Sequence, residues 1–131
     1  GLTNMKKLIM LVDDENDVRN LMTAVLSEAG YRVSARNSAV GLVDAVCLSS
    51  PDLIILDLSL PEIDGLTALA DLKRNPATRQ IPVVIASAQA QREIMIRARD
   101  LGATDFIVKP WGDGEIEWRV GHVLGLIQNV A

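Results

Sequence analysis

The chain alternates short apolar runs with longer segments in which apolar residues recur at helical spacing. The apolar runs lie at 8–12, 31–35, 53–56, 83–86 and 106–108, and each is short enough for a strand buried on both faces. The segments that alternate with them, at about 15–29, 38–49, 65–75, 90–101 and 113–128, are predicted to be helices. In the first helix we expect one stripe to face the core, formed by Val18, Leu21, Met22, Val25 and Leu26.

Repeats of strand then helix predict a parallel sheet covered on both faces, because each right-handed crossover needs a helix to return. We expect the strand order 2-1-3-4-5 of a flavodoxin-like, doubly wound α/β fold with five strands and five helices. The length of 131 residues, nearly half of them hydrophobic, indicates a single domain with one sizeable core. We place that core at about 6–128.

Charge and cysteine content restrict the surroundings of the domain. The net charge of −4, with no cluster of Lys or Arg, predicts no direct binding to nucleic acid. No segment approaches the ~18 apolar residues of a membrane span, so we expect no membrane association. The single Cys47 can form no intrachain disulfide, and its apolar neighbours predict a small core residue. A cytoplasmic location fits these features.

Polar residues follow four of the predicted strands. Asp13 and Asp14 come after the first strand and Asp57 after the third, while Ser87 follows the fourth and Lys109 the fifth. Because all strands of a parallel sheet end at the same edge, and ligands gather at that edge, we expect these side chains to meet.

Such a cluster has an excess of negative charge, which is unfavourable in a partly dry cleft unless a cation joins it. Oxygen ligands without His or a second Cys favour a hard ion, Mg²⁺ or alternatively Mn²⁺. Mg²⁺ commonly shares its coordination with substrate phosphates, so phosphoryl chemistry is the next inference. Asp57 would be the nucleophile that forms an aspartyl phosphate, with Lys109 and Ser87 contacting the phosphoryl oxygens.

At these residues the sequence resembles the CheY-like receiver domain of bacterial two-component response regulators. The matching motifs are "LVDDE", "IILDLSLPEIDG", "VVIASA" and "LGATDFIVKP", followed by the final helix. Each motif alone is a weak signal, but their order at successive strand ends is a strong one. The resemblance covers about residues 6–128.

The resemblance implies a role for each site residue. Asp14, Asp57 and the backbone carbonyl of Ser59 would bind Mg²⁺ directly, and Asp13 would act largely through water. Ser87 and Lys109 would bind the phosphoryl oxygens, and the bond from Lys109 to Pro110 would be cis. The domain would not be an enzyme in the usual sense, because it would catalyse only its own phosphotransfer and dephosphorylation.

The resemblance also implies a switch and partners. Ser87 and the aromatic Phe106 would change position together and alter the surface of helix 4, strand 5 and helix 5, through which a homodimer could form. The phosphoryl group would come from a phosphohistidine on a sensor histidine kinase or phosphotransfer protein. The domain would stand alone or belong to a longer regulator or hybrid kinase.

One residue of the last helix is expected on the outside. The stripe facing the sheet is predicted to consist of Ile116, Val120, Val123, Leu124 and Ile127. Trp118 lies off this stripe, with His122 one turn further on, so we expect an exposed aromatic on this helix.

Three other functions remain open from the sequence. An aspartate-nucleophile phosphohydrolase would want a second acid two residues after the nucleophile, where this chain has Ser59. A flavin or nucleotide carrier would want a Gly-rich phosphate loop in place of the acidic "DDEND". An unphosphorylated interaction scaffold would not need the complete acid set and Lys109. Taken singly, each polar residue is also explained as a cap, a turn residue or a surface amine.

Overall fold

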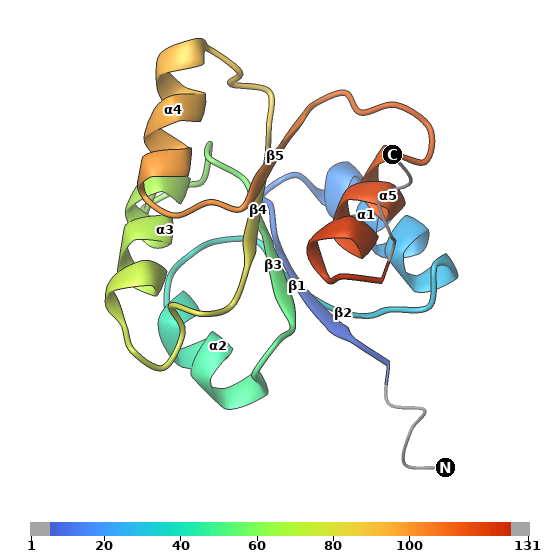
Figure 1. Cartoon of the computed structure of the whole chain (residues 1–131), viewed down its shortest axis with the longest axis horizontal. Coiled ribbons are helices and arrows are strands. Elements are labelled where there is room, and N and C mark those ends of the chain that lie inside the picture. The colour runs from blue at the N-terminus through green and yellow to red at the C-terminus, as the bar shows by residue number, and fades with distance from the viewer. Residues whose placement is uncertain (1–5, 127–131) are drawn as a thin grey trace.

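The computed structural model describes residues 6–126 and contains a parallel sheet between two layers of helices (Figure 1). The strands are β1 (Leu8–Val12), β2 (Arg32–Arg36), β3 (Leu53–Leu56), β4 (Val83–Ser87) and β5 (Asp105–Val108). The helices are α1 (Asn16–Glu28), α2 (Leu42–Ser49), α3 (Gly65–Arg74), α4 (Arg92–Asp100) and α5 (Glu115–Val123). The sheet order is β2-β1-β3-β4-β5, with every pairing parallel, which confirms the predicted topology. No helix within residues 6–126 is long and apolar enough to cross a bilayer.

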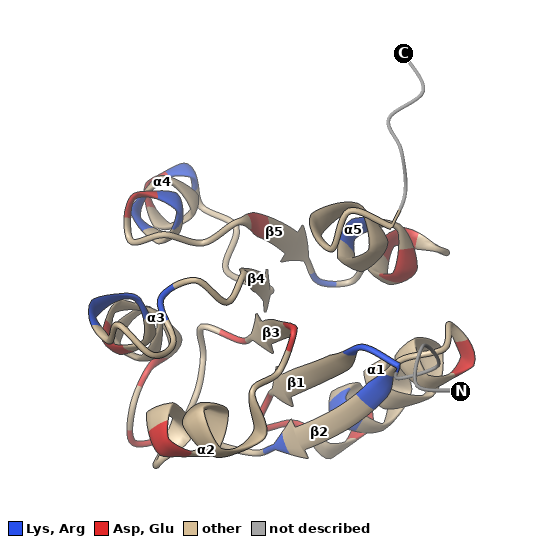
Figure 2. Ribbon diagram, turned by 60° about the horizontal axis from the view of Figure 1, so that its bottom comes forward, with Lys and Arg blue, Asp and Glu red and all other residues tan. Residues whose placement is uncertain are grey.

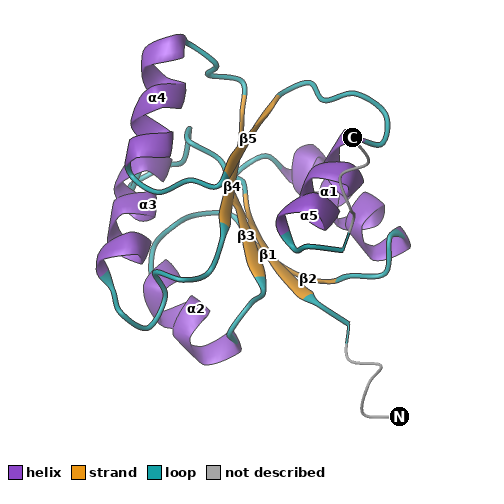
Figure 3. Ribbon diagram, viewed as in Figure 1, coloured by secondary structure: helices purple, strands orange, loops and turns teal. Residues whose placement is uncertain are grey.

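The two faces of the sheet are covered by different helices. Figures 1 and 3 show α1 and α5 on one side and α2, α3 and α4 on the other, each strand leading through a loop into a helix. Figure 2 shows no charged position on the central strands β3 and β4, while charged residues lie on helices, loops and the outer strands β2 and β5. A strand with apolar side chains on both faces can be buried by both layers, which explains the uninterrupted apolar runs in the sequence.

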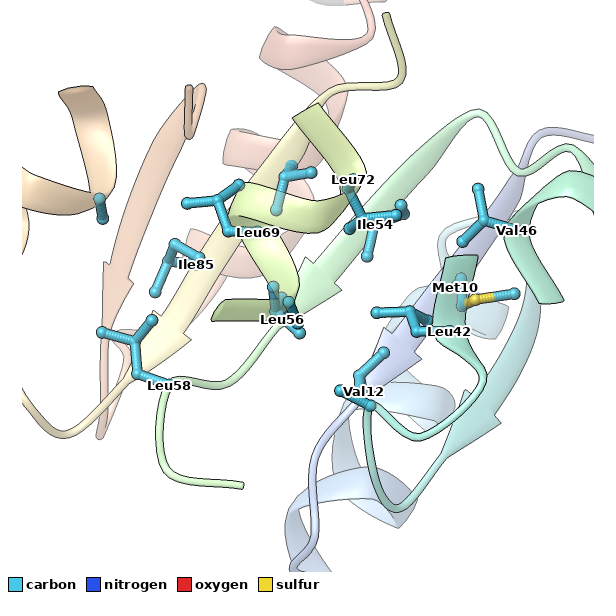
Figure 4. Close-up of a cluster of buried hydrophobic side chains, with 14 residues drawn as sticks. Met10, Val12, Leu42, Val46, Ile54, Leu56, Leu58, Leu69, Leu72 and Ile85 are labelled. Atoms are coloured by element: carbon cyan, nitrogen blue, oxygen red, sulfur yellow. The ribbon is translucent and has the colours of Figure 1, made fainter. Parts of the chain in front are cut away.

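Side-chain alternation divides each central strand between two hydrophobic cores. In β3, Ile54 and Leu56 point to the cluster under α2, α3 and α4, and Leu53 and Ile55 to the cluster under α1 and α5. Figure 4 shows the first cluster, in which Leu69 and Leu72 of α3 lie beside the strands. Packing on both faces of the sheet therefore fixes where β1, β3 and β4 end.

Local differences from the predicted elements have identifiable causes. The helix expected from 38 begins only at Leu42, after Gly41 in the left-handed conformation with φ of 70°. The last helix ends at Val123, before Gly125 with φ of 73°, and the predicted residues 127–128 lie outside the described range. Strand and helix ends otherwise agree to within a few residues.

Two burial predictions were wrong. Leu21 is 54% exposed, whereas Met22 and Leu26 of the same predicted stripe are buried and Val18 and Val25 are partly buried. The stripe facing the sheet is therefore narrower than expected, and Leu21 lies at its solvent edge. Cys47 is exposed, because α2 buries Leu42 and Val46 and leaves Cys47 on its outer side.

Candidate functional site

Backbone hydrogen bonds continue the strand pairing one residue past the strand ends and so place the polar side chains. The N–H of Asp57 donates to the carbonyl of Val12 at 3.0 Å, and the N–H of Lys109 donates to the carbonyl of Ser87 at 3.0 Å. The N–H of Asp13 likewise donates to the Arg36 carbonyl at 3.1 Å. The ends of strands far apart in sequence are thus held together by the sheet itself.

The carboxylates converge as predicted. Asp13, Asp14 and Asp57 each offer an oxygen, and these oxygens lie within 4.8 Å of one another. Asp13 is 1% and Asp57 4% exposed, whereas Asp14 is exposed to solvent. A set of carboxylate oxygens with one open, solvated side fits a hard divalent cation that keeps some of its waters. The donor set therefore suits Mg²⁺.

Lys109 partly neutralises the two buried acids. Its Nζ lies 2.5 Å from Asp13 Oδ2 and 3.4 Å from Asp57 Oδ2. Burial by itself would lower the pKa of Lys109, but the hydrogen bond to Asp13 and the charge of Asp57 outweigh burial and raise that pKa above its ordinary value. The ammonium is therefore charged at neutral pH.

Asp57 is held in an environment that disfavours its charged form. Burial raises the pKa of Asp57, and neither Lys109 nor the N–H of Ser59, which donates to Asp57 Oδ1 at 3.3 Å, offsets this effect. Nearby Asp13 raises it further. A cation or a new bond at a carboxylate oxygen would relieve this cost.

The structure also shows a contact across the mouth of the site that the sequence did not predict. The side-chain amide of Gln89 donates to Ser59 Oγ, and the Gln89 N–H donates to Ser87 Oγ at 3.0 Å. Ser59 was predicted as a metal ligand through its backbone carbonyl only, and the sequence signal for Gln89 is its position two residues beyond Ser87. Together they link the loops after β3 and β4.

Gly65 supports the acceptor loop through close backbone approach. A Cβ at this position would lie 2.2 Å from the carbonyl oxygen of Asp57 and 2.6 Å from the Cα of Leu58. The Gly65 N–H donates to the Leu58 carbonyl at 2.9 Å, and Asp64 caps the helix by accepting from the Thr67 N–H at 2.8 Å. Only glycine fits there with the loop in its present position.

The surface of α4, β5 and α5 lies next to the site. Phe106 packs against the core under α4 and lines, with Met95, a shallow hollow of about 260 Å³. On α5, Trp118 is 48% exposed, as expected, and its ring stacks on His122 with centroids 4.9 Å apart. Arg119 joins α5 to β5 through Asp105 at 3.1 Å.

Fold and site together define a doubly wound α/β domain with an acid cluster and one lysine at the carboxyl edge of its sheet. The model of the response regulator receiver domain family matches residues 9–120. The chain therefore belongs to the receiver domain family, and it is a phosphorylation-dependent signalling switch of the two-component type. The bond from Lys109 to Pro110 is cis, as the resemblance implied.

Related proteins support this assignment. The chain is 38% identical over 113 residues to the KDP operon transcriptional regulatory protein KdpE of Escherichia coli, covering 86% of this chain and 48% of KdpE. It is 33% identical to the phosphate regulon transcriptional regulatory protein PhoB of Escherichia coli, covering 97% of this chain and 56% of PhoB. The chain thus spans about half the length of the curated relatives it matches.

Solved structures show the same fold. A putative response regulator from Chloroflexus aurantiacus superposes with a TM-score of 0.87 at 30% identity, covering 92% of this chain and 99% of that one. The receiver domain of the sensor histidine kinase PA1611 from Pseudomonas aeruginosa, solved with magnesium in its active-site cleft, gives a TM-score of 0.84 at 24% identity, with the same coverage of both chains.

Proposed function

We propose that Asp57 is the phosphoacceptor of this receiver domain. The observation that carries the proposal is the convergence of Asp57 with Lys109, Asp13 and Asp14. Asp57 Oδ2 faces Lys109, so a phosphoryl group joined to the carboxylate would be bound next to an ammonium that is already in place. Forming the acyl phosphate would remove the charge of the buried Asp57 carboxylate and move negative charge to the phosphoryl oxygens, next to Lys109.

The donor is a phosphohistidine on a sensor histidine kinase or phosphotransfer protein. An Asp57 oxygen attacks phosphorus, a P–O bond forms, the P–N bond breaks, and the imidazole leaves with its electron pair and takes a proton from water. Lys109 stabilises the charge on the phosphoryl oxygens, and the Ser87 hydroxyl donates a hydrogen bond to one of them. Hydrolysis of the acyl phosphate by water, catalysed by the same groups, returns the carboxylate.

The carboxylates of Asp13, Asp14 and Asp57, with the carbonyl of Ser59, would hold Mg²⁺ or Mn²⁺ at this edge. Supporting this, their oxygens form one cluster, and Lys109 alone leaves it with an excess of negative charge. When bound, the ion supplies charge neutralisation for the phosphoryl oxygens.

The signal leaves through α4, β5 and α5. Ser87, bound to the N–H of Gln89, would turn toward the phosphoryl group, and Phe106 would move into the space behind it. A ligand can bias such a pair of states only through its differential contacts, which here are the new bonds of Ser87. The altered surface carries the exposed Trp118, a suitable anchor for a homodimer.

The domain would act in the cytoplasm as one part of a longer regulator or hybrid kinase. The relatives that are about twice its length support this, and any contact with DNA would then belong to another domain. The net charge of −4 agrees with a receiver that does not itself bind nucleic acid.

Intact mass spectrometry tests the acceptor directly. The protein is incubated with acetyl phosphate or phosphoramidate, with Mg²⁺ or with EDTA, beside Asp57→Asn. One phosphoryl adduct should form with Mg²⁺, be absent with EDTA, and be absent from the variant. An adduct that survives the substitution would show that another residue is the acceptor.

A further inference from the structure

A second group of charged side chains lies at the same edge of the sheet but outside the acceptor site. Arg19 of α1 and Arg36 at the end of β2 line a hollow of about 360 Å³ together with Ala35 and Asn37. Among the described residues, no acidic residue and none of the predicted site residues lines it. We propose that this hollow, the arginine hollow, binds an oxyanion, specifically a phosphate group.

Both guanidinium groups lack a counter-charge. Within residues 6–126, neither Arg19 nor Arg36 forms an ion pair with a carboxylate. The half-buried Arg119 of α5, by contrast, pairs with both Asp105 and Glu115. A partly buried cation without a partner is costly, and a bound anion would remove that cost.

Neutral groups already hold the two guanidinium groups in place. Arg19 donates through one amino group to the carbonyl of Asp13 at 2.7 Å and through the other to the side-chain oxygen of Asn16. Arg36 donates to the carbonyl of Val40 at 2.9 Å. These bonds fix orientation while leaving both positive charges in full, so little side-chain freedom remains to be lost when an anion binds.

Arg36 also keeps an unused donor. Its Nε is buried, and nothing among the described residues accepts a hydrogen bond from it. A buried donor without an acceptor is destabilising, and such groups call for an explanation. The planar fork of arginine matches the oxygens of a phosphate, and an anion bound beside the guanidinium would offset the cost of this buried donor.

Asp13 connects the arginine hollow to the acceptor site. The Asp13 carboxylate faces Lys109, whereas its backbone carbonyl accepts from Arg19 and its N–H donates to the Arg36 carbonyl. An anion that draws Arg19 away from this carbonyl would act on the loop that carries Asp13. The two sites are distinct in their side chains and adjacent in their backbone.

The test is a titration of ¹⁵N-labelled protein by NMR, with EDTA present and no Mg²⁺. Inorganic phosphate, adenosine monophosphate, and sodium chloride at matched ionic strength are added in separate arms. Saturable shifts at the Nε–H of Arg19 and Arg36 and the amide of Asn37, with phosphate but not chloride, are expected. Tighter binding of the monophosphate would indicate a phosphate carried on a larger ligand, and equal or weaker binding would indicate free phosphate.

Variants with matched loss of charge decide between a site and general ion binding. Arg19→Gln and Arg36→Gln should each weaken phosphate binding by at least about tenfold, since each removes a charge-assisted donor. Arg79→Gln, which removes an exposed arginine elsewhere, should bind phosphate like the parent. Arg19 and Arg36 make separate hydrogen bonds, to the carbonyls of Asp13 and Val40, so the two substitutions perturb the fold at different points.

Shifts that chloride reproduces, or that persist in both hollow variants, would overturn the proposal. Because the titration uses neither a phosphodonor nor Mg²⁺, its outcome does not depend on whether Asp57 is the phosphoacceptor.

Discussion

Lys109 lies 2.5 Å from the Oδ2 of Asp13, a residue 96 positions earlier in the chain. This contact joins the residue after β1 to the residue after β5, and the same ammonium lies 3.4 Å from Asp57 Oδ2. Lys109 is therefore part of the resting structure and, among residues 6–126, the cation that pairs with the proposed acceptor Asp57.

Replacing Lys109 by Gln should therefore separate stability from metal binding. Without the ammonium, the buried carboxylates repel one another, and the free energy of unfolding in EDTA should fall by about 1–3 kcal/mol. Mg²⁺ affinity should rise about tenfold, because a competing positive charge has gone. Phosphorylation by acetyl phosphate should be lost.

Tryptophan fluorescence can follow Mg²⁺ binding, because Trp111 lines the same hollow as Lys109. A Trp118→Ala background leaves Trp111 as the only tryptophan. Lys7→Gln is the matched control, because Lys7 is a half-exposed lysine outside the site. Its Nζ lies 4.0 Å from Asp52 Oδ1. Equal Mg²⁺ affinity in parent and Lys109→Gln would contradict the predicted repulsion.

The stability of the metal-free protein should depend on the ionisation of Asp57. Because burial raises the pKa of Asp57 in the folded protein, the folded state binds its proton more tightly than the unfolded chain does. Protonated Asp57 therefore adds to the free energy of unfolding. This contribution is fully present below 3.8, the pKa of Asp57 in the unfolded chain, and is lost as pH rises through the higher pKa of Asp57 in the folded protein.

Asp57→Asn should consequently be more stable than the parent at pH 7, by on the order of 1 kcal/mol. That advantage should shrink as pH is lowered toward 4. Urea unfolding in EDTA between pH 4 and 8 measures both curves, with Asp52→Asn as a control outside the site. Parallel curves for parent and Asp57→Asn would rule out the proposed cost of ionisation.

Gly65→Ala should damage the site without touching any polar side chain. The new methyl group would overlap the carbonyl oxygen of Asp57, so the acceptor loop or α3 must shift. We expect a loss of about 1–3 kcal/mol in the free energy of unfolding and a slower rate of phosphorylation. Gly112→Ala is the matched control, because the nearest atom to its added Cβ is 3.9 Å away. Normal phosphorylation of Gly65→Ala would show that the loop tolerates the shift.

The exposed Trp118 should matter for self-association and not for phosphorylation. Sedimentation with and without beryllofluoride should show association of the parent that Trp118→Ala reduces by about tenfold or more, as for a buried aromatic anchor. Leu48→Ala is the control, because Leu48 is 88% exposed on α2, in the opposite layer. Equal effects of the two substitutions would indicate general apolar association.

The sequence predicted the fold well because the strands are apolar on both faces and the helices are periodic. It also predicted that Asp13, Asp14, Asp57 and Lys109 lie together, since parallel strands end at one edge. Leu21 and Cys47 were misplaced because helical spacing alone does not show how wide a stripe the sheet can cover. The Ser59–Gln89 contact depends on how far two side chains reach between loops. The need for glycine at position 65 depends on how closely α3 approaches the end of β3. Neither feature is encoded in the hydrophobic periodicity of the sequence.

The sequence separation of Asp13 and Lys109 has a consequence for synthesis of the chain. A nascent chain that has emerged as far as α4 contains every acid of the cluster but not the lysine, which arrives only with the end of β5. Until then Asp13 and Asp57 lack the cation with which they pair among residues 6–126. Under the proposed function, the ability of Asp57 to accept a phosphoryl group would be acquired late, when the last strand docks, and unfinished chains would not compete with completed ones for the phosphodonor.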